Sequence, residues 1–212
     1  MITLNSELNP AGEYVSAGLT GDTSLARPSV LLHSCCGPCS TAVVEDLIHT
    51  YKITIYFYNP NITDREEYYK RLKAQREFIE KYNGNLNRPD TIGFMEGKYE
   101  PEHFFDEIKG LESEAEGGLR CRKCFLLRLE KTAGEARLSG FDCFATTLSV
   151  SPHKDYGAIS EAGREVGIKY GVEFVDRDYK ANGGYNRSVE LSKKYSLYRQ
   201  DHCGCEFSRG GK

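Results

Sequence analysis

Seven of the eight cysteines in this 212-residue chain lie in three short clusters, each with the spacing of a metal or redox site. Neighbouring thiols on one turn can hold a soft metal ion or form a strained disulfide, but they are poorly suited to joining distant parts of a fold. The cysteines therefore predict chemistry rather than covalent bracing. The clusters are Cys35-Cys36-Gly37-Pro38-Cys39, Cys121-Arg122-Lys123-Cys124 and Cys203-Gly204-Cys205.

Four thiolates are the usual ligand count of a [4Fe–4S] cluster or a structural zinc. The first two clusters can supply them from Cys35, Cys36, Cys121 and Cys124. A second thiol group remains, made of Cys39, Cys203 and Cys205. A structural zinc has no use for these further thiols, and a Cys-x-Cys pair closes only a small strained ring, which suits a labile disulfide.

The residues by themselves leave three functions open. The chain could be a metalloenzyme, a metal-free thiol–disulfide oxidoreductase that uses Cys203 and Cys205, or a non-catalytic RNA-binding module stabilised by zinc. Cys143 stands alone in an apolar segment, so it is expected to be a small buried core residue.

The composition indicates the cellular location and the kind of partner to expect for this chemistry. Hydrophobic residues make up 39% of the chain, and no apolar run approaches the roughly 20 residues of a membrane span. The first residues lack the pattern of a secretory signal, so a cytoplasmic location is expected, where clustered cysteines favour metal or redox roles. A net charge of -3 means that any contact with RNA needs a local basic patch.

Strand and helix patterns alternate along the chain, and several strands are continuously apolar. This predicts an α/β fold, a mostly parallel Rossmann-like sheet covered by helices on both faces. A polar extension is expected at residues 1–28, a single domain at 29–208 and a short tail at 209–212. Strands are expected at 29–33, 53–58, 91–94, 141–148 and 172–175. Helices are expected at 38–48, 65–82, 124–140, 159–166 and 185–195, with a short one after Pro101.

Two further details of this pattern can be checked. Thr63 or Asp64 is expected to cap the helix at 65–82. The inner side of that helix is expected to carry Tyr69, Leu72, Phe78 and Ile79.

Ligands of doubly wound folds bind beyond the carboxyl ends of the strands. Cys35 and Cys36 follow the first strand, and the loop at 149–155 follows another, so they are expected to share one edge of the sheet.

Four ordered segments resemble the QueH-type epoxyqueuosine reductases, over about residues 29–208. The first contains Cys35-Cys36-Gly37-Pro38-Cys39, and the second contains Cys121-Arg122-Lys123-Cys124-Phe125. The third covers residues 144–154 and ends in Ser151-Pro152-His153-Lys154. The fourth covers residues 198–205 and ends in Cys203-Gly204-Cys205.

The resemblance implies a fold similar to the adenine-nucleotide alpha-hydrolase type. It also implies the reductive removal of the epoxide oxygen of epoxyqueuosine at the wobble position of tRNA, which gives queuosine without cobalamin. The implied partners are a tRNA with a GUN anticodon and an unidentified electron donor.

The resemblance also implies the cofactors and their ligands. A [4Fe–4S] cluster would be held by Cys35, Cys36, Cys121 and Cys124. An additional mononuclear iron would be held by Cys39, Cys203 and Cys205. Cys203 and Cys205 would in addition be a redox-active pair that can close to a disulfide.

Other polar residues near these motifs are candidates for supporting roles. Proton delivery is expected from His153, Asp201 and His202, with Lys154 and Asp155 as further candidates for proton or phosphate contact. Single-stranded RNA is usually read by stacking and by neutralising phosphates. The residues expected to contact tRNA are Lys154, Tyr198 and Arg199, and less directly Tyr156, Tyr185 and Tyr195.

Overall fold

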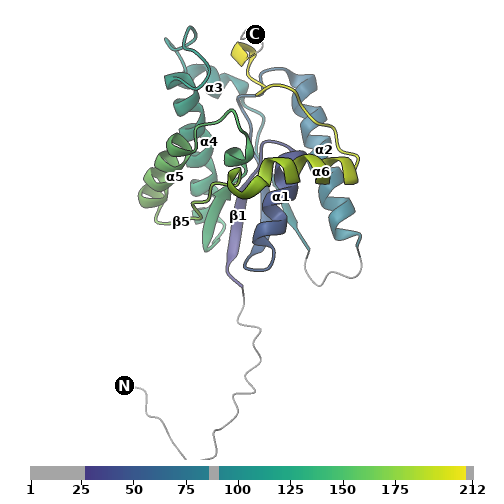
Figure 1. The fold of residues 1–212 in the computed structure, drawn as a ribbon. Coiled ribbons are helices and arrows are strands. Elements are labelled where there is room, and N and C mark those ends of the chain that lie inside the picture. The colour runs from purple at the N-terminus through teal and green to yellow at the C-terminus, as the bar shows by residue number, and fades with distance from the viewer. Residues whose placement is uncertain (1–26, 86–90, 209–212) are drawn as a thin grey trace, which may run out of the picture.

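Five parallel strands form one sheet in the order β3-β2-β1-β4-β5, within the computed structural model, which describes residues 27–85 and 91–208 (Figure 1). The strands are β1 (Ser29–His33), β2 (Lys52–Phe57), β3 (Gly93–Glu96), β4 (Cys143–Thr146) and β5 (Glu173–Phe174). The helices are α1 (Gly37–Leu47), α2 (Arg65–Asn83), α3 (Pro101–Glu107), α4 (Leu119–Leu138), α5 (Tyr156–Tyr170) and α6 (Gly184–Lys194). Short 3-10 turns are η1 (Leu148–Val150), η2 (Ala181–Gly183) and η3 (Glu206–Ser208).

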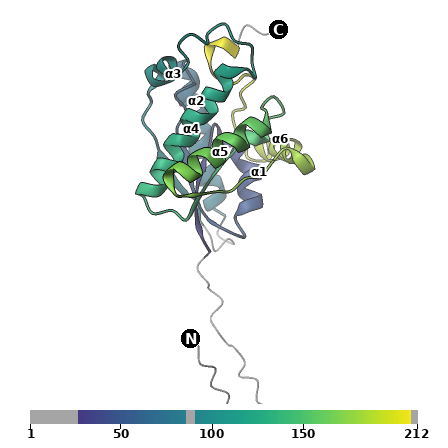
Figure 2. The same cartoon turned by 90° about the vertical axis from the view of Figure 1, so that its left-hand side faces the viewer.

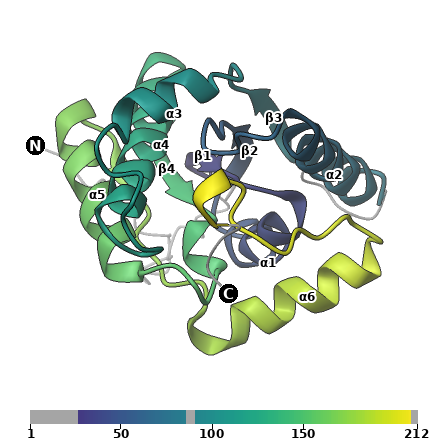
Figure 3. The same cartoon turned by 90° about the horizontal axis from the view of Figure 1, so that it is seen from above.

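Helices cover both faces of the sheet, as the apolar strands predict. Successive side chains of a strand point to opposite faces. In β1, Val30 and Leu32 pack with the core of α1 and α2, whereas Leu31 packs with the core of α4 and α5. Seen from above, α1, α2 and α6 lie on one side and α4 and α5 on the other (Figure 3). The predicted fold class is confirmed.

Short polar side chains begin the helices at the carboxyl edge of the sheet. Asp64 caps α2 by accepting from the backbone N–H of Glu66 at 2.9 Å, and Asp155 caps α5 by accepting from that of Gly157 at 2.8 Å. α1 instead begins with Pro38 in its first turn, where a missing N–H does no harm, and it has no side-chain cap.

Two expectations for the helices need correction. α4 begins at Leu119 instead of Cys124, so Cys121 lies inside the helix together with Cys124, within its first two turns. Tyr69 was wrongly expected on the inner side of α2: its side chain is 48% exposed, and Tyr68 is buried in its place. Leu72, Phe78 and Ile79 are buried as expected.

Two segments predicted from the sequence, the N-terminal extension and the C-terminal tail, lie mostly outside the described residues. The extension expected at 1–28 falls outside the described residues except for Arg27 and Pro28, and the tail at 209–212 falls wholly outside them. Pro28 is already joined to the sheet, because its carbonyl accepts from the N–H of Lys52 at 2.9 Å.

The C-terminal part of the chain returns to the carboxyl edge of the sheet. After α6, residues 196–205, named here the C-terminal strap, cross above α1 and lead to η3 (Figure 3). Phe207 of η3 packs with Phe104 of α3 and with Leu127 of α4, and Figure 2 shows η3 at the end of the molecule where α3 and the start of α4 lie. None of the helices in the described ranges has the length and apolar character needed to span a membrane.

Candidate metal and redox centre

The turn between β1 and α1 gathers three thiols. Cys35, Cys36 and Cys39 are buried, and their sulfur atoms all lie within 4.8 Å of one another. The Sγ atoms of Cys35 and Cys36 are 3.9 Å apart. Gly37 permits this turn to lie against α2, since a Cβ there would stand 2.5 Å from the carbonyl oxygen of Ala74. We name these three cysteines the thiol triad.

The second cysteine pair lies on one side of α4. A spacing of three residues places Cys121 and Cys124 about one helical turn apart on the same face. Cys124 is buried and Cys121 is partly exposed. The Cys121 sulfur accepts a hydrogen bond from the N–H of Gly117 at 3.3 Å, which ties the preceding loop to this thiol.

The third pair reaches the same region through the C-terminal strap. Cys205 is buried against Cys124 and Leu127. The Cys203 thiol lies close enough to Cys205 for that neighbour to lower its pKa, and it lies within electrostatic range of Cys35. Cys124 in turn interacts electrostatically with Cys203. The three clusters thus converge, and all of their cysteines are free thiols.

Burial and mutual hydrogen bonds lower the pKa of some of these thiols and raise the pKa of others. Hydrogen bonds from Cys36 and Cys39 hold the pKa of Cys35 well below its usual range, and a hydrogen bond from Cys205 does the same for Cys203. Burial raises the pKa of Cys36 to about 12 and that of Cys124 to about 11. A thiolate-bound metal must therefore displace protons from the less acidic thiols.

Buried cations surround these sulfur atoms. Arg71 of α2 and Arg128 of α4 are each 1% exposed, and Lys154 is partly buried in the loop before α5. Burial disfavours the charges of Arg128 and Lys154, yet neighbouring thiolates outweigh it and raise the pKa of both groups. The thiolates that do so include Cys203 and Cys35. The cations offset the negative charge that several thiolates bring to one place.

The donor set fits a thiolate-bound metal centre. Clustered thiolates are the ligands that zinc, copper(I) and iron–sulfur clusters prefer. One terminal nitrogen of the Arg128 guanidinium is buried without a hydrogen-bond partner among the described residues, which suits a site completed by an anionic group. The chain thus supplies both the soft ligands and the compensating charge.

The polar candidates of the loop before α5 are placed as follows. His153 is exposed in this loop, and the Asp155 carboxylate is occupied as the cap of α5. The Tyr156 hydroxyl donates to Asp176 at 2.9 Å, and the ring of Tyr195 packs edge-on against Phe78. These last two tyrosines therefore have structural partners.

The candidates of the C-terminal strap lie closer to the thiols. His202 Nδ1 pairs with Asp201 Oδ1 at 2.8 Å, whereas His202 Nε2 is buried without a partner among the described residues. The Tyr198 hydroxyl donates to Glu67 at 2.7 Å, and its side chain is 40% exposed. The Arg199 guanidinium lies 5.2 Å from the centre of the Tyr185 ring.

Sequence reasoning missed several residues that hold the thiols. Gln200 donates from Nε2 to the Cys36 sulfur at 2.9 Å. Arg71 donates to the carbonyl of Cys203 at 2.9 Å and to that of His202 at 3.2 Å. A usable signal was present in α2, where the polar residues Glu67, Arg71 and Gln75 recur every fourth position along its buried side.

His33 was also missed, and it has a structural role. Its ring is fully buried, with Nδ1 2.9 Å from the Thr146 hydroxyl and Nε2 3.1 Å from the Tyr58 carbonyl. Burial lowers the pKa of His33 to about 3, so the ring is neutral. Both of its nitrogens are occupied, so His33 braces β1 between β2 and β4 just before the thiol triad.

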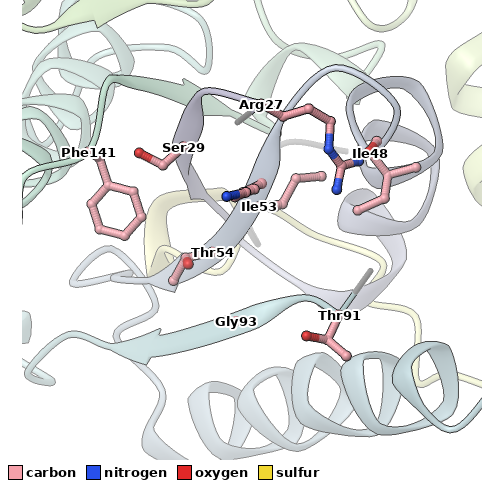
Figure 4. A pocket seen from close by; sticks show the side chains of 9 residues that line it. Arg27, Ser29, Ile48, Ile53, Thr54, Thr91, Gly93 and Phe141 are labelled. Atoms are coloured by element: carbon pink, nitrogen blue, oxygen red, sulfur yellow. Dashed lines mark hydrogen bonds between the residues drawn. The ribbon is translucent and has the colours of Figure 1, made fainter. Parts of the chain in front are cut away.

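A cavity at the opposite end of the sheet is separate from this centre. It has a volume of about 300 Å³ and is lined by residues in the first parts of three strands, Ser29 of β1, Thr54 of β2 and Gly93 of β3 (Figure 4). No cysteine lines it. This cavity is therefore not part of the cysteine centre at the carboxyl edge.

Comparisons with known proteins identify the family of this chain. The family model described as "Epoxyqueuosine reductase QueH" matches residues 30–210. Curated proteins named epoxyqueuosine reductase QueH are similar over most of their length. The protein of Streptococcus pyogenes serotype M1 is 43% identical over 86% of this chain and 71% of its own. That of Staphylococcus epidermidis is 42% identical over 86% and 76%, and that of Thermotoga maritima is 36% identical over 85% and 90%. The chain belongs to the QueH family of epoxyqueuosine reductases and is an enzyme of the oxidoreductase class.

Proposed function

We propose that this chain removes the epoxide oxygen of epoxyqueuosine at the wobble position of tRNA and leaves the alkene of queuosine, without cobalamin. Family membership supports the reaction. The observation that carries the proposal is the convergence of the thiol triad, Cys124 and Cys203 among buried cations. Such a site is built to bind metal and to exchange electrons rather than to pack a core.

We assign the metal ligands in two groups. Cys35, Cys36, Cys121 and Cys124 would hold a [4Fe–4S] cluster, and Cys39, Cys203 and Cys205 would hold an additional iron. The closeness of Cys39 to Cys35 and Cys36 supports two adjacent sites rather than two distant ones. When bound, iron would supply Lewis-acid activation of the epoxide oxygen and one-electron steps.

The residues of the chain account for the stoichiometry. Removing the oxygen of an epoxide as water takes two electrons and two protons and leaves a carbon–carbon double bond. The pair of Cys203 and Cys205 can provide both electrons and become a disulfide. With Cys203 as the thiolate, Cys205 gives one proton, and the second proton would come from His202 or solvent. An external donor must then reduce that disulfide before the next turnover. The lowered pKa of Cys203 and the raised pKa of Cys205 suit a pair in which Cys203 is the thiolate and Cys205 keeps its proton until the disulfide forms.

Proton delivery and RNA contact are assigned to the strap and the neighbouring loop. His202, held by Asp201 through Nδ1, presents its unpartnered Nε2 for proton transfer, and His153 is the exposed alternative. Lys154, Tyr198 and Arg199 would contact the tRNA anticodon loop by charge and stacking. The reaction belongs in the cytoplasm, where tRNA is modified.

Turnover on the modified tRNA tests the proposal. The protein is purified without oxygen, mixed with tRNA carrying epoxyqueuosine and a reductant, and the digested nucleosides are measured by mass spectrometry. Wild type should form queuosine, Cys121→Ala and Cys203→Ser should not, and Cys143→Ala should behave as wild type because its thiol lies in the core. Full turnover by Cys121→Ala would instead favour a metal-free dithiol reaction.

A further inference from the structure

The C-terminal strap is held over the sheet by one buried side chain. Arg71 of α2 donates through its two terminal nitrogens to the carbonyls of Cys203 and His202, at 2.9 and 3.2 Å. These residues are more than 130 positions away in the sequence. Arg71 therefore joins the middle of α2 to the backbone that carries the third cysteine pair.

Arg71 is itself fixed in place. Its Nε donates to Glu67 Oε1 at 2.6 Å, and both side chains are almost fully buried. The other oxygen of Glu67 accepts from the Tyr198 hydroxyl at 2.7 Å. Glu67 and Arg71 thus hold the strap at two points, at Tyr198 before the cysteine pair and at Cys203 within it.

The backbone of the cysteine pair fits closely against this guanidinium. Gly204 has a φ of +108°, which side-chain-bearing residues rarely adopt. A Cβ at Gly204 would lie 3.1 Å from Arg71 Nη1 and 3.0 Å from the Ile62 side chain. The turn at Gly204 is therefore shaped to lie on Arg71, and the two residues specify one position for Cys203 and Cys205.

Arg71 also faces the thiol triad. It interacts electrostatically with Cys36 and Cys35, the first of which accepts a hydrogen bond from Gln200 of the strap. A single guanidinium is thus in contact with the strap and within electrostatic range of the first cysteine motif. A mere brace for packing would not need a charged group at this point, since buried ion pairs are costly compared with apolar contacts.

We propose that Arg71 is a positioning residue for the reaction, because it holds the Cys203–Cys205 pair in register with the thiol triad, with Glu67 as its support. The expected effect on kcat rests on the proposed function, whereas the expected effect on the position of the strap does not. A pair displaced by an ångström reacts more slowly. The same strap carries Tyr198 and Arg199, which are assigned to tRNA contact, so KM for tRNA is expected to rise as well. Loss of Arg71 should therefore reduce kcat by a larger factor than it raises KM.

The test compares Arg71→Met, Arg71→Lys and Arg76→Met as iron-loaded full-length proteins. Arg76 lies five residues further along α2 and pairs with Glu96 at 2.5 Å, away from the strap, so Arg76→Met is the control for removing a cation from this helix. Because Arg71→Met leaves the Glu67 carboxylate buried without a cation, the double variant Glu67→Gln/Arg71→Met is measured as well. Its neutral amide can still accept from Tyr198.

Two readouts are needed. In steady state, Arg71→Met and the double variant should lose kcat on the order of 10- to 100-fold, with a smaller rise in KM for tRNA. Arg71→Lys should recover part of the loss, since an ammonium can still reach one carbonyl. In hydrogen exchange, the peptide covering residues 197–205 should exchange at least about tenfold faster, with peptides of α5 unchanged. Arg76→Met should match wild type in both.

An unchanged kcat in both Arg71→Met and the double variant would overturn the proposal. So would faster exchange spread evenly over α5 and the strap, because that is the signature of general destabilisation. If the wild type itself forms no queuosine, the proposed function fails. Hydrogen exchange confined to residues 197–205 then still supports the positioning role, and its absence overturns that role independently.

Discussion

Two polar clusters at the carboxyl edge of the sheet are built in opposite ways. Asp176, just after β5, accepts from Tyr156 at 2.9 Å, from Ser160 at 2.7 Å and from Arg164 at 2.8 Å. None of the side-chain atoms in this Asp176 network is buried without a partner. The cysteine centre, in contrast, leaves buried polar atoms of Arg128, Gln200 and His202 without partners among the described residues.

The difference shows in which cluster the residues of the chain alone satisfy all buried hydrogen-bonding groups. A structural cluster satisfies its own hydrogen bonds, because an unpaired buried group costs roughly 1–3 kcal/mol. A functional cluster can leave such groups for a ligand to complete. By this criterion the Asp176 network supports the fold, and the cysteine centre has unpaired groups that the proposed metal and substrate would complete.

The largest expected effect is the difference in activity between replacing a buried thiol of the thiol triad and replacing the buried core thiol of Cys143. Cys36→Ala removes a proposed metal ligand from the thiol triad and should reduce queuosine formation by more than about 100-fold, since replacing groups that only hydrogen-bond to metal ligands already costs about 10- to 100-fold. Cys143→Ala should keep both iron and activity, because Cys143 is a 3% exposed core residue of β4 that lines no metal site. Comparable losses in the two variants would remove the distinction between them.

A smaller effect is expected where the strap meets the thiol triad. Gln200→Leu keeps the size of the side chain but removes the N–H that donates to the Cys36 sulfur. We expect iron affinity to fall about tenfold, measured by chelator competition, because hydrogen bonds to ligand sulfur stabilise the bound state. The opposite change, tighter binding, would mean that this contact exists only without metal.

The Asp176 network should affect stability and not chemistry. Hydrogen bonds from Ser160, Tyr156 and Arg164 outweigh burial and hold the pKa of Asp176 below its ordinary value of 3.8. Asp176→Asn should therefore cost about 1 kcal/mol of unfolding free energy at neutral pH. Because the folded pKa is depressed, this difference is full above the unfolded pKa and disappears as the pH falls below about 4. Urea unfolding at pH 7 and pH 3 measures it, with turnover at pH 7 unchanged.

Sequence patterns predicted the parts of the molecule that depend on local spacing. The apolar strands, the Asp64 cap, the buried Cys143 and the closeness of the β1–α1 turn to the loop after β4 all follow from residues near one another in the chain or from the rules of a parallel sheet. Tyr69 was wrong because two adjacent tyrosines in α2 compete for one inner position, and the helical repeat places Tyr68 there.

The contacts that hold the site could not be predicted in the same way. Arg71 to Cys203 and Gln200 to Cys36 join segments more than 130 residues apart, and their partners are a backbone carbonyl and a sulfur atom. Such contacts depend on how the strap crosses the sheet, which no local periodicity encodes. The helical spacing of Glu67, Arg71 and Gln75 showed that α2 buries polar groups, but not what those groups hold.

Iron and acid-labile sulfide per chain, measured on protein purified without oxygen and followed by EPR before and after dithionite, test the central claim most directly. The account predicts about four to five irons and about four sulfides per chain, with a signal that appears on reduction. Cys143→Ala should give the same values and Cys36→Ala should lose most of the sulfide. One zinc per chain with no sulfide would contradict the account.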